Sequence, residues 1–404
     1  TRADVSDKDT LAFRGALEWL PSESTSILLS IDNTEDRASP QGKTRIEANP
    51  LCPLFLGTTC GPLDNPYDVE SGLIPTNGTD SKGVSLVINW GINDAWSFKS
   101  ITADRESDTN NNIDFDTTPA RIVDVFAEYY DEQFTQEFQF TYDAGGSLAG
   151  VFGAFYLDGK AGGLVRNIFV DSIFGTTDGR TETESIALYT DWSYALSDRL
   201  NLNFGARLTE EEKRGVAFNA GYTDDTFETV ALVLTDQDDR VTFDSVSPRL
   251  GLDFSLSDDV MLYGSVSRGF KSGGFNVRAQ EIFDPDSRLP FKDEELTNFE
   301  LGVKSTLADG QLVLNAAAFY GDYTDVQVST FTEIDTPDGP QFFGRFLNAG
   351  DAEIKGVEVE FIYSPEGAEW LTLSGNVNYL DAAPKEFLDE NNNGLVDTQV
   401  ITNA

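Results

Sequence analysis

The sequence VMLYGSVSRGFKSGGFN at residues 260–276, together with LTNFELGVK at residues 296–304, decides the fold. In the second stretch Phe299, Leu301 and Val303 alternate with polar residues or glycine. Side chains of a strand point alternately to opposite faces, so this pattern predicts a strand with one apolar and one polar side. A glycine-rich and then acidic passage separates the two stretches. We therefore expect two neighbouring strands joined by a long loop.

The same unit recurs along the chain, and we expect about fourteen strands. Short turns and long loops are predicted to alternate strictly, with long polar loops at residues 38–80, 108–120 and 210–240. Residues 121–130 fit a short helix or a strand equally well. Strands joined in this way, with Trp and Tyr near their ends, are typical of an antiparallel transmembrane β-barrel with short periplasmic turns and long extracellular loops.

Composition excludes several classes of function. The chain has 404 residues, with 69 acidic and 28 basic residues, a formal charge of -41 and no histidine. Nucleic acid is an unsuitable partner, because binding phosphate requires clustered Lys and Arg. The absence of histidine excludes Ser-His-Asp catalysis and His-ligated zinc. The 29 Phe residues argue against disorder, in spite of the charge.

No apolar run approaches the ~18 residues of a membrane helix, but a closed barrel crosses a bilayer without one, because each strand faces lipid only at every second residue. A soluble β-sandwich would show the same alternation in any single strand. The sandwich gives no reason for every long loop to lie at one end, so the barrel is the preferred interpretation. The chain opens with the polar residues TRAD and no Met, and we interpret it as an internal segment.

Residues 263–276, 298–304 and 348–360 resemble the barrel region of TonB-dependent receptors, in the order and spacing of that family. The resemblance covers roughly residues 240–380 and implies part of a 22-stranded outer-membrane barrel. Family members also carry an N-terminal plug and a TonB-contacting box. Neither is visible here, so residues 1–404 are expected to be a partial barrel without the plug and without the C-terminal strands.

The resemblance further implies energised import of a scarce, bulky nutrient by a monomer in the bacterial outer membrane. A ferric siderophore or other iron complex is the first expectation, and cobalamin, oligosaccharide or aromatic compounds are alternatives within the family. The implied partners are the TonB-ExbB-ExbD complex, outer-membrane lipid and lipopolysaccharide. A passive porin, a secreted calcium-binding β-rich adhesin and an outer-membrane enzyme remain as rivals. An enzyme is the least favoured, since the chain has no histidine base.

Two local patterns indicate structural sites. Cys52 and Cys60 lie close together in a long loop and predict a disulfide formed in an oxidising compartment. The segment 389–397 has the spacing of a calcium loop, although Val400 stands where such a loop has Glu. A polar surface loop has the same composition, and residues 108–116 are a weaker candidate because they contain no Gly. The calcium ligands predicted on this basis are Asp389, Asn391, Asn393 and Asp397.

Charged residues on the polar faces of the strands are interpreted as a hydrated lumen wall, with acid–base chemistry as the alternative. They are Glu300, Glu358, Glu360, Asp253, Arg207 and Arg249. Gly273 and Gly274 are expected to supply unusual backbone angles at a strand-to-loop transition. The side chains around them are candidates for contact with an anionic ligand at the mouth of the barrel. These candidates are Arg268, Phe270, Lys271, Phe275 and Arg278.

Overall fold

The computed structural model describes residues 5–336 and 339–387, which are almost entirely β-structure. Among these residues no helix is long and apolar enough to cross a membrane. A single turn of α-helix, α1 (Cys52–Leu56), and a short 3-10 helix, η1 (Pro285–Arg288), interrupt the strands. The strands are β1 Thr10–Ser22, β2 Thr25–Asp36, β3 Asn77–Gly91, β4 Trp96–Asp114, β5 Val123–Asp143, β6 Leu148–Phe169, β7 Ile173–Ser197, β8 Leu200–Tyr222, β9 Val230–Ser257, β10 Val260–Lys271, β11 Glu294–Leu307, β12 Leu312–Thr324, β13 Gln327–Thr336, β14 Gly339–Asn348, β15 Gly350–Tyr363 and β16 Leu373–Phe387.

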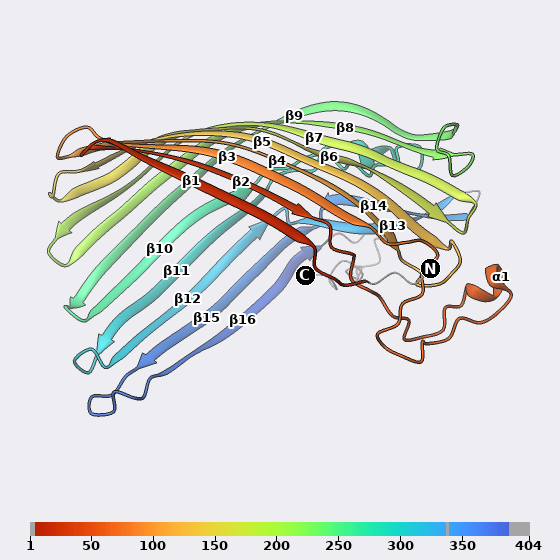
Figure 1. Cartoon of the computed structure of the whole chain (residues 1–404). Coiled ribbons are helices and arrows are strands. Elements are labelled where there is room, and N and C mark those ends of the chain that lie inside the picture. The colour runs from red at the N-terminus through yellow and green to blue at the C-terminus, as the bar shows by residue number, and fades with distance from the viewer. Residues whose placement is uncertain (1–4, 337–338, 388–404) are drawn as a thin grey trace.

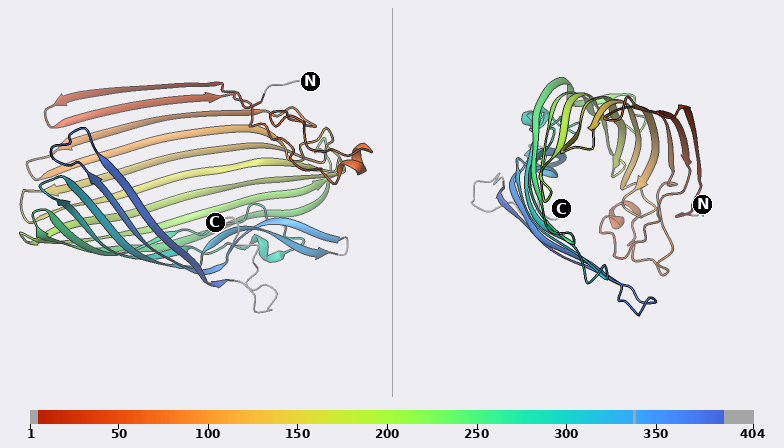
Figure 2. Two further views of the ribbon diagram at one scale, coloured as in Figure 1. Left: turned by 90° about the horizontal axis from the view of Figure 1, so that it is seen from below. Right: turned by 90° about the vertical axis from the view of Figure 1, so that its left-hand side faces the viewer.

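Fourteen strands form one antiparallel sheet in chain order, from β1 through β12 to β15 and β16, and β13 pairs with β14 in a separate hairpin. The sheet curves around a hollow, with β1 and β16 as its two edges in the described part of the chain (Figure 2). Tight turns lie at one end of the strands, whereas α1 and the β13–β14 hairpin lie at the other (Figure 1). The expected number of about fourteen strands is confirmed. The expected placement of tight turns at one end of the barrel and long loops at the other is also confirmed.

The register sorts the side chains into an outer apolar face and an inner polar face. Leu252 of β9 lies opposite Leu202 of β8 and Gly264 of β10, and Gly264 lies opposite Leu301 of β11. Leu252 is 47% exposed and Leu301 is 69% exposed. Large apolar side chains left open in continuous rows indicate a surface that lipid covers.

Each outer apolar row ends at charged residues on the side of the loops. On β8 the row ends at Leu208 and Glu210 follows, and opposite them on β9 Val246 is followed by Asp244. The strands continue far beyond this level, since β9 has 28 residues and a strand needs only about 9–11 to cross a bilayer. The loop-side halves of β5 to β9 therefore stand outside the membrane as a paired extension of the sheet.

This extension corrects the predicted loop boundaries. The expected acidic loop at residues 210–240 is β-structure up to Tyr222 and again from Val230, and residues 121–130 enter β5 at Val123. Strict alternation of loop lengths is also wrong, because residues 170–172 form a tight turn at the loop end between β6 and β7. Neither face of the extension contacts lipid, because the outer face meets water and part of the inner face packs against the loop between β10 and β11. Its sequence therefore lacks the apolar period of two, and backbone pairing holds its strands together. Ion pairs bridge its neighbouring strands, such as Arg214 with Asp238 (2.6 Å).

Candidate functional site

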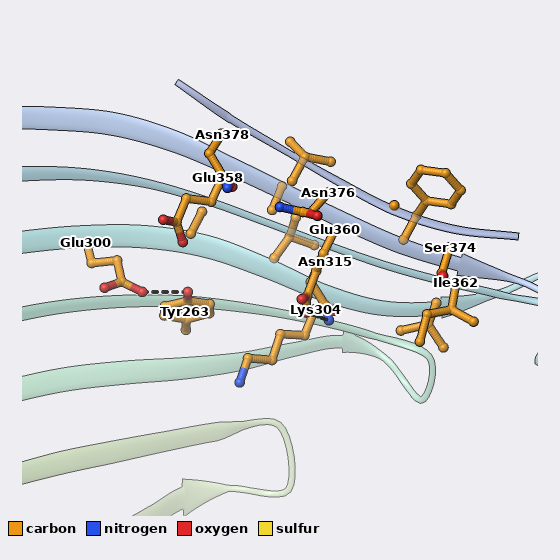
Figure 3. A pocket seen from close by; sticks show the side chains of 17 residues that line it. Tyr263, Glu300, Lys304, Asn315, Glu358, Glu360, Ile362, Ser374, Asn376 and Asn378 are labelled. Atoms are coloured by element: carbon orange, nitrogen blue, oxygen red, sulfur yellow. Dashed lines mark hydrogen bonds between the residues drawn. The ribbon is translucent and has the colours of Figure 1, made fainter. Parts of the chain in front are cut away.

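The inner face of β10 to β16 is a polar wall (Figure 3). Tyr263 on β10 donates a hydrogen bond to Glu300 on β11 (2.6 Å), and Asn315 on β12 donates one to Glu360 on β15 (2.7 Å). These side chains line a hollow of about 790 Å³. Other polar residues that line it are Lys304, Glu358, Ser374, Asn376 and Asn378. The hollow is a surface that many polar side chains share.

The charged residues of β7 to β9 on the same face are largely engaged with one another. Arg207 lies over the rings of Phe155 and Tyr189, at 5.2 Å and 5.8 Å from their centroids. Arg249 approaches Asp191 at 3.5 Å. In the same wall Asn203 donates to Asp253 (2.7 Å). The inner-face positions expected from the alternation are thus where the sequence analysis placed them, and their mutual contacts favour a structural wall.

The loop between β10 and β11 folds inward against the extension formed by β7, β8 and β9. Phe275 is only 7% exposed and packs on Gly215 of β8, where a Cβ atom would lie 2.5 Å from the Phe275 side chain. Asn219 of β8 donates to the carbonyl of Ala279 (2.8 Å), and Thr235 of β9 donates to the same carbonyl (2.7 Å). These contacts fix the loop as an inner layer at the mouth of the barrel.

A cavity of about 260 Å³, which we call the mouth cavity, opens between this inner layer and the β13–β14 hairpin. It combines two lysines, Lys213 and Lys271, with three phenylalanine rings. Phe291 and Phe346 stack with their centroids 5.9 Å apart. The whole lining consists of Thr181, Lys213, Lys271, Ser272, Gly273, Gly274, Phe275, Phe291, Gln327 and Phe346.

The predicted ligand contacts divide into two groups. Lys271 and Phe275 line the mouth cavity. Arg268 and Phe270 do not, because they continue the outer row of Val266, and Arg268 pairs with Glu295 of β11. The period of two along β10 fixes this outward orientation, and contact of Arg268 and Phe270 with a ligand stays a prediction.

Arg278 lies near the mouth cavity without lining it. Its guanidinium lies 4.9 Å from the ring centroid of Phe346 and donates to Ser329 (2.8 Å). Burial of this guanidinium lowers the pKa of Arg278. The residue therefore contributes to the packing that supports the β13–β14 hairpin.

Gly273 and Gly274 are needed for their small size rather than for unusual backbone angles. Neither Gly273 nor Gly274 has a positive φ. A Cβ atom on Gly273 would collide with the carbonyl oxygen of Phe291 and with the ring of Phe243, and Gly274 exchanges two backbone hydrogen bonds with Phe291 (3.1 and 2.9 Å). Close approach of two chain segments explains the pair, in place of the expected unusual angles.

Sequence reasoning missed Lys213, Phe291, Gln327 and Phe346 as lining residues. Lys213 lay within a stretch interpreted as a loop. The other three belong to connections and a hairpin where no periodicity indicates an orientation. The only signal was the neighbouring glycine pair, which marks a place where two segments meet.

A second loop unit lies beside the mouth. Cys52 and Cys60 form a disulfide with their Cα atoms 5.8 Å apart, and this disulfide packs against the fully buried Ile122. Arg45 from the same loop donates to the carbonyl of Gly61 (2.7 Å) and also to that of Thr117. The β2–β3 loop is therefore held against the β4–β5 connection.

Three buried aspartates, Asp114, Asp116 and Asp124, meet beneath this unit. Burial, followed by the negative charges of Asp114 and Asp116, raises the pKa of Asp124 to about 6. The calcium loop predicted from Asp389, Asn391, Asn393 and Asp397 lies outside the described residues.

The family model described as "TonB dependent receptor-like, beta-barrel" matches residues 24–401. The chain belongs to the TonB-dependent receptor family. Members of this family are β-barrel proteins of the bacterial outer membrane, so the exposed apolar rows are the surface that faces lipid. The members of this family are receptors and transporters.

Two receptors that are similar in sequence are matched over part of their length. The pesticin receptor of Yersinia pestis is 28% identical over 240 residues, which are 55% of this chain and 32% of that protein. The metal-pseudopaline receptor of Pseudomonas aeruginosa is 31% identical over 147 residues, which are 36% of this chain and 18% of that protein.

Solved structures show the same architecture. The ferric yersiniabactin uptake receptor of Yersinia pestis superposes with a TM-score of 0.71 at 19% identity, covering 95% of this chain and 54% of that one. At this level of identity the likeness establishes the fold. The chain thus spans about half of this solved receptor and about a third of the pesticin receptor.

Proposed function

We propose that the complete protein imports a ferric siderophore across the outer membrane, with energy supplied through the TonB-ExbB-ExbD complex. The observation that carries this proposal is the mouth cavity, which combines Lys213 and Lys271 with the rings of Phe275, Phe291 and Phe346. Siderophore oxygens that hold Fe³⁺ carry negative charge, and their organic framework is in part apolar. A cavity with ammonium groups and aromatic walls suits the part of such a complex that enters it.

The charge of the whole chain gives this cavity its selectivity. With a formal charge of -41, most of the surface repels an anion, but this repulsion is screened beyond about 8 Å at physiological ionic strength. An anionic complex therefore binds where basic side chains lie within a few ångströms of it. Lys213 itself lies 3.3 Å from Glu211, which leaves Lys271 as the principal anion contact in the proposal.

The relatives support the same class of cargo. The solved receptor with a TM-score of 0.71 takes up ferric yersiniabactin, and other solved structures with the same fold include a ferric-catecholate import receptor and a ferric citrate transporter. These are properties of those proteins. For this chain they define the panel of ligands with which the test should begin.

The test is uptake of radioactive iron by a deletion strain that carries the intact receptor or its Lys271→Ala variant. A charge-assisted hydrogen bond contributes about 1.5–3 kcal/mol, so the variant should bind its siderophore about 10- to 100-fold more weakly. Lys292→Ala is the matched control, because Lys292 is 74% exposed and lies outside the mouth cavity. Equal loss in both variants would remove the mouth cavity from the proposal.

The panel also includes cobalamin, oligosaccharides and aromatic compounds. Exclusive transport of one of these would refute the iron cargo but leave the family function intact. Uptake that persists in a strain without ExbB would refute energised import itself. Siderophore uptake that requires ExbB and is weakened only by Lys271→Ala is the expected result.

A further inference from the structure

The end of β4 and the start of β5 bring three aspartates together outside the membrane. One carboxylate oxygen from each of Asp114, Asp116 and Asp124 lies within 4.8 Å of the others. Asp114 and Asp116 are each 8% exposed, and Asp124 is 1% exposed. The β4–β5 connection and the β2–β3 loop cover the three side chains.

Two of the aspartates are held in place by backbone N–H groups. The Oδ2 atom of Asp114 accepts from Gly72 (2.7 Å), and its Oδ1 atom accepts from Thr117 (2.7 Å). The Oδ2 atom of Asp116 accepts from Val123 (2.8 Å). These bonds orient both carboxylates, and within the described residues neither forms an ion pair with a basic side chain.

Asp124 differs from both, because neither of its carboxylate oxygens accepts a hydrogen bond. Its nearest basic group is Arg121, whose Nε atom lies 3.5 Å from Oδ2. The Nη1 atom of Arg121 is engaged elsewhere, with Asp225 (2.9 Å) and Asp171 (3.3 Å). A buried carboxylate with no hydrogen-bond donor, beside two other carboxylates, is stabilised by a further positive charge.

We propose that Asp114, Asp116 and Asp124 bind a calcium ion. Calcium takes six to eight oxygen ligands at about 2.3–2.6 Å, and three carboxylate oxygens within 4.8 Å of one another fit around a single ion of that size. Asp124 offers Oδ1 and also Oδ2, because neither accepts a hydrogen bond from the described residues and Arg121 approaches Oδ2 only to 3.5 Å. The remaining ligands are water or backbone carbonyl oxygens, as in other calcium sites.

Calcium is chosen over other metal ions because the ligands are carboxylates and because the site is buried beside a cavity. The three ligands are carboxylates, which favour hard cations over zinc or copper. Magnesium retains several of its waters, and this suits an open site better than a group of buried side chains. Asp114 also lines a cavity of about 570 Å³ beside the β2–β3 loop, which provides a path for the ion.

Binding of the ion would order the β2–β3 loop. Gly72 from this loop is bonded to Asp114, and Asn49 from the same loop donates to the carbonyl of Asp116 (3.3 Å). Arg45 reaches the carbonyl of the adjacent Thr117. A cation that neutralises the aspartates therefore fixes the point to which this loop, with its disulfide, is attached.

The experiment compares the full-length receptor with its Asp124→Asn and Asp131→Asn variants, purified in detergent and treated with chelator. Asp131 lies on the same strand but is exposed, so it controls for loss of charge. Calcium chloride is titrated by calorimetry, and trypsin cleavage after the exposed Lys43 reports the order of the loop. The receptor and Asp131→Asn should each bind one tight calcium and be cleaved at least tenfold more slowly with calcium than without it.

Asp124→Asn should lose this binding and the calcium dependence of cleavage. Without calcium, Asp124→Asn should also resist trypsin better than the unaltered receptor after chelator treatment, because the variant has one buried negative charge fewer. Equal calcium binding by Asp124→Asn and the unaltered receptor would overturn the proposal, as would a receptor whose cleavage ignores calcium. If Asp124→Asn does not fold, metal analysis of the desalted, unaltered receptor decides the case. One calcium per chain supports the site, and none overturns it.

Discussion

Replacement of Leu252 by arginine tests the lipid-facing surface most directly. Leu252 lies near the middle of the outer apolar row of β9, between Val246 and Leu256, and its neighbours across the sheet are Leu202 and Gly264. It is 47% exposed, so an arginine fits without a steric clash and its cost is that of charge in hydrocarbon. For a barrel this cost is about 2–4 kcal/mol at the bilayer midplane, or a factor of about 30 to 1,000 in the folded population.

Ser265→Arg is the matched control. Ser265 lies one strand away on the inner face, opposite Gly251 and Glu300. An arginine there meets water and a carboxylate, and we expect a change within about 0.5 kcal/mol. The assay is reversible urea unfolding of the full-length receptor in phospholipid vesicles, followed by tryptophan fluorescence.

Position along the row gives a further check. Leu256→Arg, close to the tight turn between β9 and β10, should cost only about 0–1 kcal/mol. Equal costs for Leu252→Arg and Ser265→Arg would refute the assignment of outer and inner faces. A cost that does not fall from Leu252 to Leu256 would refute the placement of the bilayer along β9.

Other substitutions test the mouth of the barrel. Gly273→Ala should weaken binding of the siderophore and lower the stability of the β10–β11 loop by roughly 1–3 kcal/mol, because its Cβ atom collides with Phe291. The control is Gly269→Ala, whose Cβ atom meets no atom within 4 Å. This control should have no effect in thermal unfolding or in ligand titration. Replacement of both Cys52 and Cys60 by serine opens a loop of sequence separation 8 and should cost about 2–3 kcal/mol of local stability. Faster trypsin cleavage after Lys43, with an unchanged unfolding midpoint of the barrel, would agree with this local effect. A large shift of the barrel midpoint would show that the disulfide supports the whole sheet.

The proposed calcium site and the mouth cavity show how far pattern reasoning reaches in this chain. Asp114 and Asp116 stand two residues apart in a stretch that the sequence marks as acidic, and Asp124 follows in a region that fits a helix or a strand. Their convergence depends on the register of β4 with β5, which places Asp114 opposite Asp124. Acidic loops are common in this sequence, so composition alone does not single out these three residues.

The barrel, its apolar and polar faces, the tight turns at the end opposite the loops and the family all follow from the sequence alone. The reason is that a strand crossing a bilayer must alternate at every second residue, and the part of each strand that crosses the lipid shows this alternation. How far the strands extend beyond the lipid came from the tertiary structure alone, because the alternation is not required where neither face contacts lipid. The tertiary structure alone also brought Phe275, Phe291 and Phe346 to one cavity, since contacts between loops depend on register and packing rather than on any local period.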